Sequence, residues 1–414
     1  MSMGPITLFD KSFLQSLSLD ESVWFDHFFL VNICPLFFVE TLADLKKRRE
    51  GRRAPEDEVR IIADKTPESG GGVNAFHKNM CVGNLLGQPV PMDGRILMSR
   101  GRSGRHGSKK GVLFEESPEA KAFSRWQRGE FQELEREQAR VWRAAIQQRP
   151  DYDEVAKMIE ALGIPLEDIK TLEAARDAAV NSAAGGTKFS KTFSLAVLML
   201  GIPDAYLNHI FHRWHTPPYR PLAHFAPYAG FVFSIDLFFY ICVARGLISG
   251  ERLTNRVDMA YLYYLPFSML FTSSDDLHRR CAPLFLRGDQ EFIWGPELKE
   301  DLGRTNSHFS QLPEAEKERG VYAIASYPPP EARLLSRLWE RFLPRARRNA
   351  TERPRPPRDD ATAVMEINKF TDALKKAELC AGDDGEPDAV ILERSVRRKR
   401  GQWWQVPKDL PADS

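Results

Sequence analysis

The sequence has few cysteines, no excess of either charge and no internal repeat, and each absence excludes a class of protein. Its five cysteines are scattered over 414 residues without a Cys-x-x-Cys pair, which disfavours a disulfide framework and a cysteine-rich zinc site. Lys and Arg number 58 against 57 Asp and Glu, so a polyanion would have to bind through local basic patches. The hydrophobic content of 43% excludes wholesale disorder.

Signals for export and for a membrane span are also missing. The N-terminus has no basic region followed by an apolar stretch, which predicts that there is no signal peptide. The most apolar segment, Ala229–Ile248, approaches membrane-span length but carries Asp236 at its centre, and a carboxylate at mid-bilayer costs roughly 2.5–3.5 kcal/mol. We therefore expect a buried core helix here, no membrane partner and a cytoplasmic location.

The first part of the chain has the pattern of an α/β unit. Ile6–Phe9 is a short β-branched and apolar run, and a second run at Phe28–Cys34 is closed by Pro35. Helical spacing follows both runs, and it resumes at Phe38–Leu45. The order of strand, helices, strand and helix predicts an α/β fold, with a parallel sheet covered by helices on both faces.

The middle and the end of the chain have a different composition. Residues 46–111 are rich in charge, Pro and Gly and predict a loop-rich region, whereas Ser117–Gln148 predicts one long charged helix with Ser117 as its N-cap. Beyond Tyr327 the chain is rich in Pro and Arg. We divide the chain into a discontinuous core (1–48 and 188–300), a loop-rich and helical insertion (49–187) and a basic, partly disordered extension (301–414).

Four acidic residues occupy similar positions relative to the expected elements. Asp10 follows the first strand, Glu40 begins the helix after the second, Asp258 heads a helix, and Asp275 follows a strand expected at Phe267–Thr272. Residues just past the carboxyl ends of parallel strands converge at one edge of a sheet. Carboxylates gathered there repel one another unless a cation neutralises them, and Mg²⁺ or Mn²⁺ prefers such oxygen ligands. A site of this kind suits the attack of water on a phosphodiester.

These acidic residues lie in motifs that resemble a known family. Asp10-Lys-Ser12 after a β-run is similar to the opening Asp-x-Ser/Asn of PIN-like nuclease domains, and Glu40 lies in a run similar to that family's second acidic element. A helix headed by Asp258, then a strand ending in Thr-Ser-Ser-Asp275, is similar to its closing pair. The resemblance covers about 45 residues at the start and about 70 from 228 to 298.

The resemblance implies a fold and a set of roles. Asp10, Glu40, Asp258 and Asp275 would be the catalytic metal ligands for Mg²⁺ or Mn²⁺, and Ser12 or Ser273 would assist through its hydroxyl group. The substrate would be nucleic acid, with RNA favoured over DNA. Asp276 could replace Asp275 as a ligand.

Structural interpretations compete with these roles. Asp10, Asp258 and Asp275 could all be helix N-caps, whereas Glu40 lies in a strongly apolar run and is harder to explain as a cap. Asp236 would need a buried partner, such as Arg245 or a tyrosine. The motif His209-x-x-His212-x-x-His215 lacks a common helix face and a nearby cysteine, so structural or solvated histidines are expected. His278 is expected at the surface.

Contact with nucleic acid would need basic segments. The best candidate is the Gly- and Ser-rich loop at 93–110, expected to be mobile, with substrate-binding candidates Arg100, Arg102, Arg105, Lys109 and Lys110. Arg341–Arg358 and Arg394–Arg400 with Trp403-Trp404 could bind RNA by charge and stacking, or could dock on a protein partner. For the loop at 93–110, the alternative interpretation is an ordinary solvated loop that binds no nucleic acid.

The sequence therefore predicts a Mg²⁺- or Mn²⁺-dependent nuclease with a PIN-like core. The alternative is a catalytically inactive PIN-like scaffold that binds protein or RNA partners. The oversized insertion and the long charged helix favour that alternative, since such surfaces commonly serve partners; a protein partner could bind through the insertion or the C-terminal tail.

Overall fold

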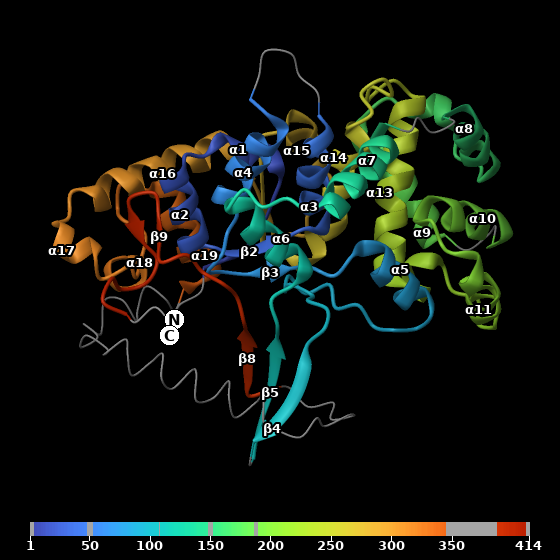
Figure 1. The fold of residues 1–414 in the computed structure, drawn as a ribbon. Helices are drawn as coiled ribbons and strands as arrows, with labels where there is room; N and C mark the ends of the chain where they lie inside the picture. Colours follow the sequence, from blue (N-terminus) through green and yellow to red (C-terminus); the bar gives the residue numbers. More distant parts are fainter. Residues whose placement is uncertain are drawn as a thin grey trace.

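A five-stranded parallel sheet forms the centre of the molecule in the computed structural model (Figure 1). The structure describes residues 4–47, 53–106, 108–147, 152–185, 189–344 and 387–410. The strand order is β3-β2-β1-β6-β7. The strands of this sheet are β1 (Ile6–Phe9), β2 (Leu30–Ile33), β3 (Gly72–Val73), β6 (Leu270–Ser273) and β7 (Glu291–Trp294).

The order of the strands places a crevice beside β1. Thr7 in β1 pairs with Val31 on one side and with Leu270 on the other. The chain first fills one side of the sheet with β2 and β3 and later fills the other side with β6 and β7. In open parallel sheets, ligands bind beyond the carboxyl ends of the two strands between which the order reverses. Here these are β1 and β6, and the predicted α/β class with a parallel sheet is confirmed.

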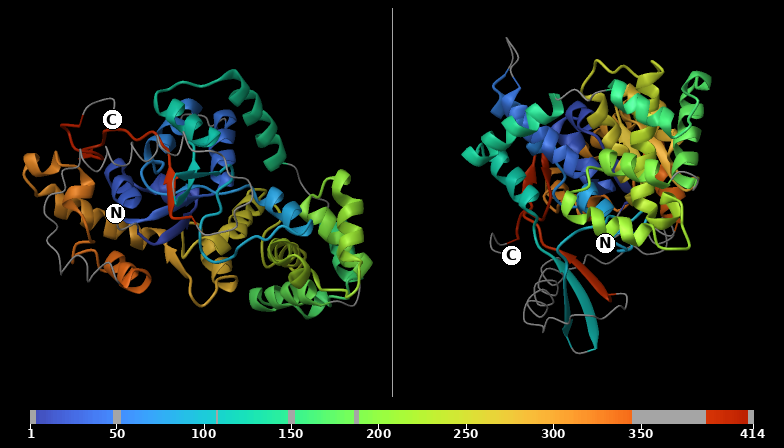
Figure 2. Two further views of the ribbon diagram at one scale, coloured as in Figure 1. Left: turned by 90° about the horizontal axis from the view of Figure 1, so that it is seen from below. Right: turned by 90° about the vertical axis from the view of Figure 1, so that its right-hand side faces the viewer.

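Helices surround the sheet and form a further lobe beside it (Figures 1 and 2). All residues of β1 and β6 are buried, so both faces of the sheet are covered. The helices are α1 (Lys11–Ser16), α2 (Leu19–Phe28), α3 (Pro35–Ala43), η1 (Asp44–Lys46), α4 (Pro55–Lys65), α5 (His77–Leu85), α6 (Pro118–Gln127), α7 (Glu133–Gln147), α8 (Tyr152–Ala161), η2 (Leu166–Asp168), α9 (Leu172–Ala184), α10 (Phe189–Leu200), α11 (Asp204–Trp214), α12 (Leu222–Phe225), α13 (Pro227–Ala244), α14 (Asn255–Ala260), η3 (Tyr261–Phe267), α15 (Asp276–Cys281), η4 (Ala282–Leu284), α16 (Gly295–Ser310), α17 (Glu314–Lys317), α18 (Val321–Ile324) and α19 (Arg333–Phe342).

The apolar helix α13 is an interior element of the lobe. It is long and apolar enough to cross a membrane, but 78% of its apolar window is buried, and it packs against α5, α8, α9, α10 and α12. Asp236 at its centre accepts a hydrogen bond from the hydroxyl group of Tyr263. Burial raises the pKa of Asp236 to about 6, against the opposing charge of Arg256. The expected core helix with a buried tyrosine partner is confirmed, while Arg245 instead donates to the carbonyl oxygen of Ile169.

Two predictions about the middle of the chain are wrong in detail. The expected single helix at Ser117–Gln148 is two helices, α6 and α7, separated by a turn in which Gly129 has a φ of 75°. This left-handed conformation favours glycine and ends α6. Ser117 is the N-cap as predicted, since its side chain accepts a hydrogen bond from the amide of Ala120. In addition, the short strand β3 belongs to the central sheet, although it lies within the span assigned to the insertion.

The basic segment expected to be a mobile loop is a hairpin. Strands β4 (Arg102–His106) and β5 (Lys109–Phe114) pair antiparallel, and β8 (Ala389–Leu392) pairs parallel with β5. The three strands form an arm that projects from the body (Figures 1 and 2). Segments far apart in the sequence therefore share one small sheet, which local composition does not reveal.

The end of the chain docks on the core beside α2. Trp403 lies in the small hairpin of β9 (Lys399–Arg400) and β10 (Trp403–Trp404) and is fully buried. Its ring meets that of Trp24 edge to face, with 4.7 Å between centroids. The side-chain oxygen of Asn306 in α16 accepts hydrogen bonds from both indole N–H groups, at 3.0 Å and 2.8 Å. Trp403 is therefore a core residue and is not available to stack on RNA.

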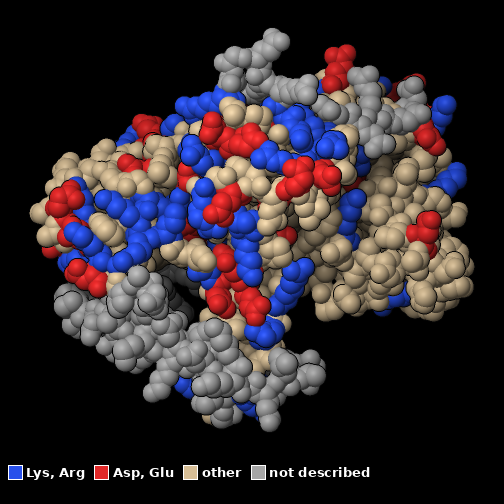
Figure 3. Space-filling view, viewed as in Figure 1, with Lys and Arg blue, Asp and Glu red and all other residues tan. Residues whose placement is uncertain are grey.

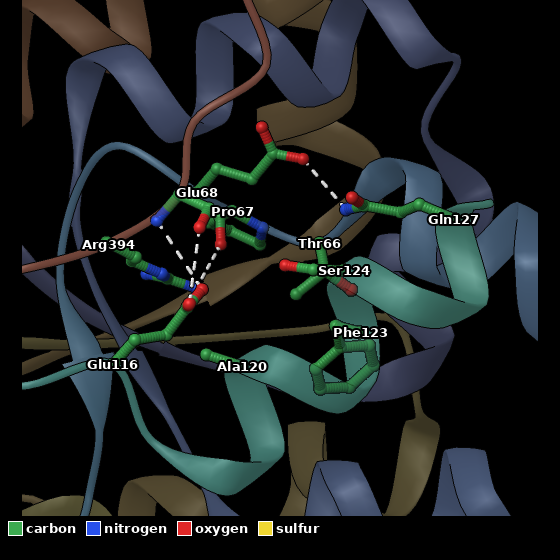
Figure 4. Close-up of a pocket in the computed structure, with 10 residues that line it drawn as sticks. Thr66, Pro67, Glu68, Glu116, Ala120, Phe123, Ser124, Gln127 and Arg394 are labelled. Carbon is green, nitrogen blue, oxygen red and sulfur yellow. Dashed lines mark hydrogen bonds between the residues drawn. The ribbon is translucent and has the colours of Figure 1, made fainter. Parts of the chain in front are cut away.

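Three arginines of the basic run before Trp403 bind the core. Arg400 and Asp26 form a fully buried ion pair at 2.9 Å, and Arg397 pairs with Asp64 and Glu68. Arg394 donates to the carbonyl oxygen of Pro67 in a small polar pocket (Figure 4). The described part of this run thus docks within its own chain. Residues 345–358 of the other predicted arginine-rich segment lie outside the described residues.

We predict that Arg400→Ala lowers the free energy of unfolding by about 3 kcal/mol, because breaking a buried pair leaves an uncompensated charge. The amides of Glu68, Ser69 and Gly70 also donate hydrogen bonds to Asp26 and remain after the substitution. The expected loss of stability is therefore at the lower end of the range for broken buried ion pairs. Urea unfolding measures it. Arg319→Ala, which removes an exposed pair with Glu316, should change stability by less than about 1 kcal/mol. Equal effects of the two substitutions would contradict the buried-pair account.

Candidate active site

A cavity of about 160 Å³ opens at the carboxyl ends of β1 and β6. The four acidic residues predicted as metal ligands, Asp10, Glu40, Asp258 and Asp275, all line it, although they come from four separate elements. Ser12 lines it as well. The other lining residues are Lys11, Gln15, Ala43, Asp44, Lys47, Arg143, Arg252, Thr254, Val257 and Tyr261.

Asp10 is held in one orientation by its neighbours. It is the N-cap of α1, where its Oδ1 accepts a hydrogen bond of 3.0 Å from the amide of Phe13, and Ser12 Oγ donates to its Oδ2. Burial raises the pKa of Asp10, but the hydrogen bond and charge of His278 and the hydrogen bond of Ser12 outweigh it, so the pKa is lowered. Asp10 is therefore both a helix cap and a cavity carboxylate, and the two interpretations do not exclude each other.

His278 is fully buried beneath the cavity, and the expectation of a surface histidine is wrong. Its Nε2 donates to the backbone carbonyl oxygen of Asp258 at 2.6 Å, and its Nδ1 lies 2.8 Å from Ser273 Oγ and 3.6 Å from Asp10 Oδ2. Burial lowers the pKa of His278, but its interactions with Asp10 and Asp258 prevail and raise it to about 9. A buried imidazolium thus joins Asp10 to the backbone of α14. Ser273 orients this ring and does not line the cavity.

Glu40 lies inside α3, and the prediction that it begins the helix is wrong. The hydroxyl group of Tyr261 donates to Glu40 Oε2. Lys11 Nζ lies 3.8 Å from Glu40 Oε1 and 3.0 Å from Asp44 Oδ2. Burial lowers the pKa of Lys11, but Glu40 and Asp44 outweigh it, so the pKa is raised. Lys11 is therefore a fixed cation on this wall of the cavity.

Asp258 is the least satisfied of the four carboxylates. It lies in the first turn of α14, and its Oδ2 is buried and accepts no hydrogen bond. Burial raises the pKa of Asp258 to about 7; His278 opposes this shift, and the negative charges of Glu40 and Asp275 add to it. An oxygen atom in this position has no protein donor to compensate its loss of water.

Asp275 and Arg252 form the outer wall. Asp275 is the N-cap of α15, where its Oδ1 accepts a hydrogen bond of 2.7 Å from the amide of Leu277. The Nη2 atom of Arg252 lies 3.2 Å from Asp275 Oδ2 and 3.7 Å from Asp258 Oδ2. Asp276, the alternative ligand, is exposed and does not line the cavity.

The donor set matches the chemistry of Mg²⁺ or Mn²⁺, but it is not arranged around an ion. Carboxylate and hydroxyl oxygens line the cavity, and the unpartnered Asp258 Oδ2 lies among them; hard divalent cations prefer such ligands. Within the described ranges, no group of three or more His, Cys, Asp or Glu is positioned to hold a metal ion. Lys11 and Arg252 contact three of the predicted ligands instead. A divalent ion would therefore have to compete with side-chain cations.

Sequence reasoning missed the cations and one of the acids around this cavity. Asp44 follows Glu40 by four residues, which places it on the same face of a helix, and Lys11 adjoins Asp10; both signals were present in the sequence. Arg143 comes from α7 and Arg252 from the segment before α14. Only the packing of α7 on α3 and η1 brings Arg143 to the site.

The basic residues predicted to bind substrate are not at this cavity. Arg100 precedes β4, Arg102 and Arg105 lie in β4, and Lys109 and Lys110 lie in β5; none of them lines the cavity. Arg102 forms an ion pair with Glu115 of its own arm. In Figure 1 the arm extends from the side of the body opposite α1, α14 and α15. Direct contact of these residues with a group bound in the cavity is therefore ruled out in this arrangement.

The histidine motif of α11 forms an aromatic surface. His209, His212 and His215 are all exposed, and the ring of His215 stacks on Phe211 at 5.2 Å with an interplanar angle of 9°. No cluster of metal-ligating side chains occurs there among the residues with described positions. Figure 3 shows few charged side chains over this part of the face. Two rings of the motif, those of His212 and His215, therefore contact Phe211 at the surface.

No protein-family model matches the chain, and no curated protein or solved structure matches it. The functional interpretation therefore depends on the geometry of the cavity and on the motifs that line it.

We predict that the stability difference between the wild type and His278→Gln shrinks as the pH rises from about 6.5 to about 9. The pKa of His278 is raised to about 9 in the folded protein. The protonated side chain therefore stabilises the fold fully at pH values below its pKa in the unfolded chain. This stabilisation is lost as the pH rises through its pKa in the folded protein. The shift corresponds to on the order of 3 kcal/mol.

Urea unfolding at several pH values in EDTA measures this difference. His308→Gln serves as a control, because His308 is exposed and lies outside the cavity. A gap between wild type and His278→Gln that stays constant from pH 6.5 to 9 would show that His278 is not a buried imidazolium.

Proposed function

We propose that this chain is a PIN-like nuclease that hydrolyses phosphodiester bonds of nucleic acid with Mg²⁺ or Mn²⁺, RNA being favoured over DNA. The observation that carries the proposal is the meeting of Asp10, Glu40, Asp258 and Asp275 in one cavity beyond β1 and β6. Asp10, Asp258 and Asp275 could instead have been helix N-caps with side chains that point away from a common cavity. A cytoplasmic location and the choice of RNA belong to the same proposal; the location derives from the sequence pattern, and the choice of RNA derives from the resemblance to PIN-like nucleases alone.

The proposed roles follow from the contacts of each side chain. Asp10, Glu40, Asp258 and Asp275 would hold the ion or ions. A bound divalent ion would supply Lewis-acid stabilisation of the negative charge that develops during displacement at phosphorus. Ser12 and His278 hold Asp10 in place, and this fixed orientation reduces the reorganisation needed during the reaction.

Basic residues of the cavity would serve the substrate. Lys47, Arg143 and Arg252 line the same space as the acids, and positive side chains supply most of the non-specific affinity for a phosphate backbone. A cavity lined by carboxylates and by basic side chains can bind a divalent ion and also the phosphodiester that the ion activates. The separate basic arm of β4 and β5 could bind a distant part of a long substrate.

A catalytically inactive scaffold remains the second candidate, and one observation favours it. Lys11 and Arg252 already neutralise Glu40, Asp258 and Asp275 in part, so the cluster has a function in stability without any ion. In that case the cavity would be a structural ion-pair network. Binding of partners would then occur through other surfaces.

Hydrolysis of single-stranded RNA tests the proposal directly. We expect cleavage in Mg²⁺ or Mn²⁺ and none in EDTA. Asp10→Asn and Asp258→Asn should each lower the rate of cleavage by more than the roughly 10- to 100-fold that is typical when a hydrogen-bond partner of a metal ligand is replaced. The control Asp57→Asn, at an exposed position, should cleave at the wild-type rate. Wild-type activity that survives in Asp10→Asn or Asp258→Asn would reject these metal roles.

Thermal melting distinguishes the two candidates without an activity assay. If the cavity binds Mn²⁺, an ion concentration of 100 times Kd stabilises the folded chain by about 2.7 kcal/mol. The melting temperature of the wild type should then rise, and that of Asp258→Asn should rise much less. No shift in the wild type is the result that the inactive scaffold predicts.

A further inference from the structure

Arg252 is the most exchangeable cation of the cavity. Its side chain is 59% exposed, whereas that of Lys11 is 13% exposed. Lys11 has three oxygen contacts, with the Asp44 carboxylate and with the carbonyl and carboxylate of Glu40. Arg252 contacts Asp275 at 3.2 Å and donates to Thr254 Oγ1 at 3.1 Å, but it remains 3.7 Å from Asp258.

The position of Arg252 conflicts with that of a bound ion. Its guanidinium lies against Asp258 Oδ2 and Asp275 Oδ2, two oxygens that a divalent cation would use. The side chain of Arg252 is itself exposed, so it is already partly solvated and can leave these carboxylates once a divalent ion neutralises them. A divalent ion carries twice the charge, and it can reach the unpartnered Asp258 Oδ2 that Arg252 does not satisfy.

We propose, on the basis of the function proposed above, that Arg252 exchanges partners when the site is loaded. In the free protein it neutralises Asp258 and Asp275; when a divalent ion takes these carboxylates, the released guanidinium binds a phosphate group of the substrate at the mouth of the cavity. The planar guanidinium suits this second role, because it can donate two parallel hydrogen bonds to a phosphate.

Two further basic residues line the cavity in which the phosphate would bind. Arg143 and Lys47 line the same cavity from α7 and from the end of η1. The cavity that Arg252 borders therefore carries basic side chains from three separate segments, although Lys47 Nζ lies 3.4 Å from Asp44 Oδ1. Loading with the ion would also raise the affinity for substrate, since it converts Arg252 from a partner of acids into a partner of phosphate.

The exchange predicts effects of opposite sign for Arg252→Ala. Calorimetric titration of Mn²⁺ into the full chain, without substrate, should show binding about fivefold tighter than in the wild type, because a competing exposed pair is removed. A phosphorothioate-substituted single-stranded oligoribonucleotide, measured by fluorescence anisotropy in Mn²⁺, should bind about tenfold more weakly. The salt dependence of that binding should fall by about one phosphate contact.

Two variants control the experiment. Arg252→Lys keeps the charge without the planar fork, so Mn²⁺ affinity should stay near the wild type while oligonucleotide affinity falls. Arg60→Ala removes a similarly exposed arginine, paired with Asp57 outside the cavity, and should change neither. Circular dichroism verifies that each variant is folded.

The outcomes separate the exchange from the proposed function. Mn²⁺ binding that is unchanged or weaker in Arg252→Ala, or oligonucleotide binding that does not fall, overturns the exchange even if the wild type hydrolyses RNA. If neither the wild type nor Arg252→Ala binds Mn²⁺, both proposals fail. Mn²⁺ binding by Arg252→Ala alone also overturns the exchange, because it shows that the ion does not displace Arg252 in the wild type.

Discussion

Carboxylates that share one cavity must be neutralised, and this requirement organises the whole site. Cations contribute at different depths, among them His278 beneath the cavity, Lys11 on one wall and Arg252 at the outer side. His278 is the central one, because it is fully buried and connects the Asp10 side chain with the Asp258 backbone. Burial and the negative charges of Glu40 and Asp275 raise the pKa of Asp258 to about 7, although His278 and Arg252 oppose this shift.

The sheet explains why these groups meet. Asp10 immediately follows β1 and Asp275 follows β6, and the two strands are parallel neighbours. Asp258 is brought close because η3 connects α14 to β6 and His278 holds the backbone of α14 from below. Any change that separates β1 from β6 would therefore disperse the acidic residues and expose His278.

The sequence allowed the sheet class and the gathering of the acids to be predicted, because both depend on local patterns. Strand β1 was predicted with its exact bounds as a β-branched run, and Asp10 and Asp275 follow from the geometry of parallel strands. The position of Glu40 within α3 was missed because Pro35 starts the helix earlier than its apolar spacing indicated. The burial of His278 was missed because it depends on contacts with Ser273 and α14.

Long-range packing accounts for the other differences. Arg400 and Trp403 have the composition of a solvated basic tail, yet Asp26 and Trp24, which lie far away in the sequence, bury them. The basic hairpin of β4 and β5 likewise acquires β8 from near the end of the chain. No local pattern encodes such partners, and the complementary charge of Asp26 becomes visible only when the chain is folded.

Anomalous diffraction from crystals soaked in Mn²⁺ would test the central claim most directly. The account predicts an anomalous peak in the cavity, about 2.0–2.2 Å from carboxylate oxygens of at least two of the four acids, with Arg252 moved away from Asp258. A cavity without a peak at saturating Mn²⁺, with Arg252 still between Asp258 and Asp275, would contradict it.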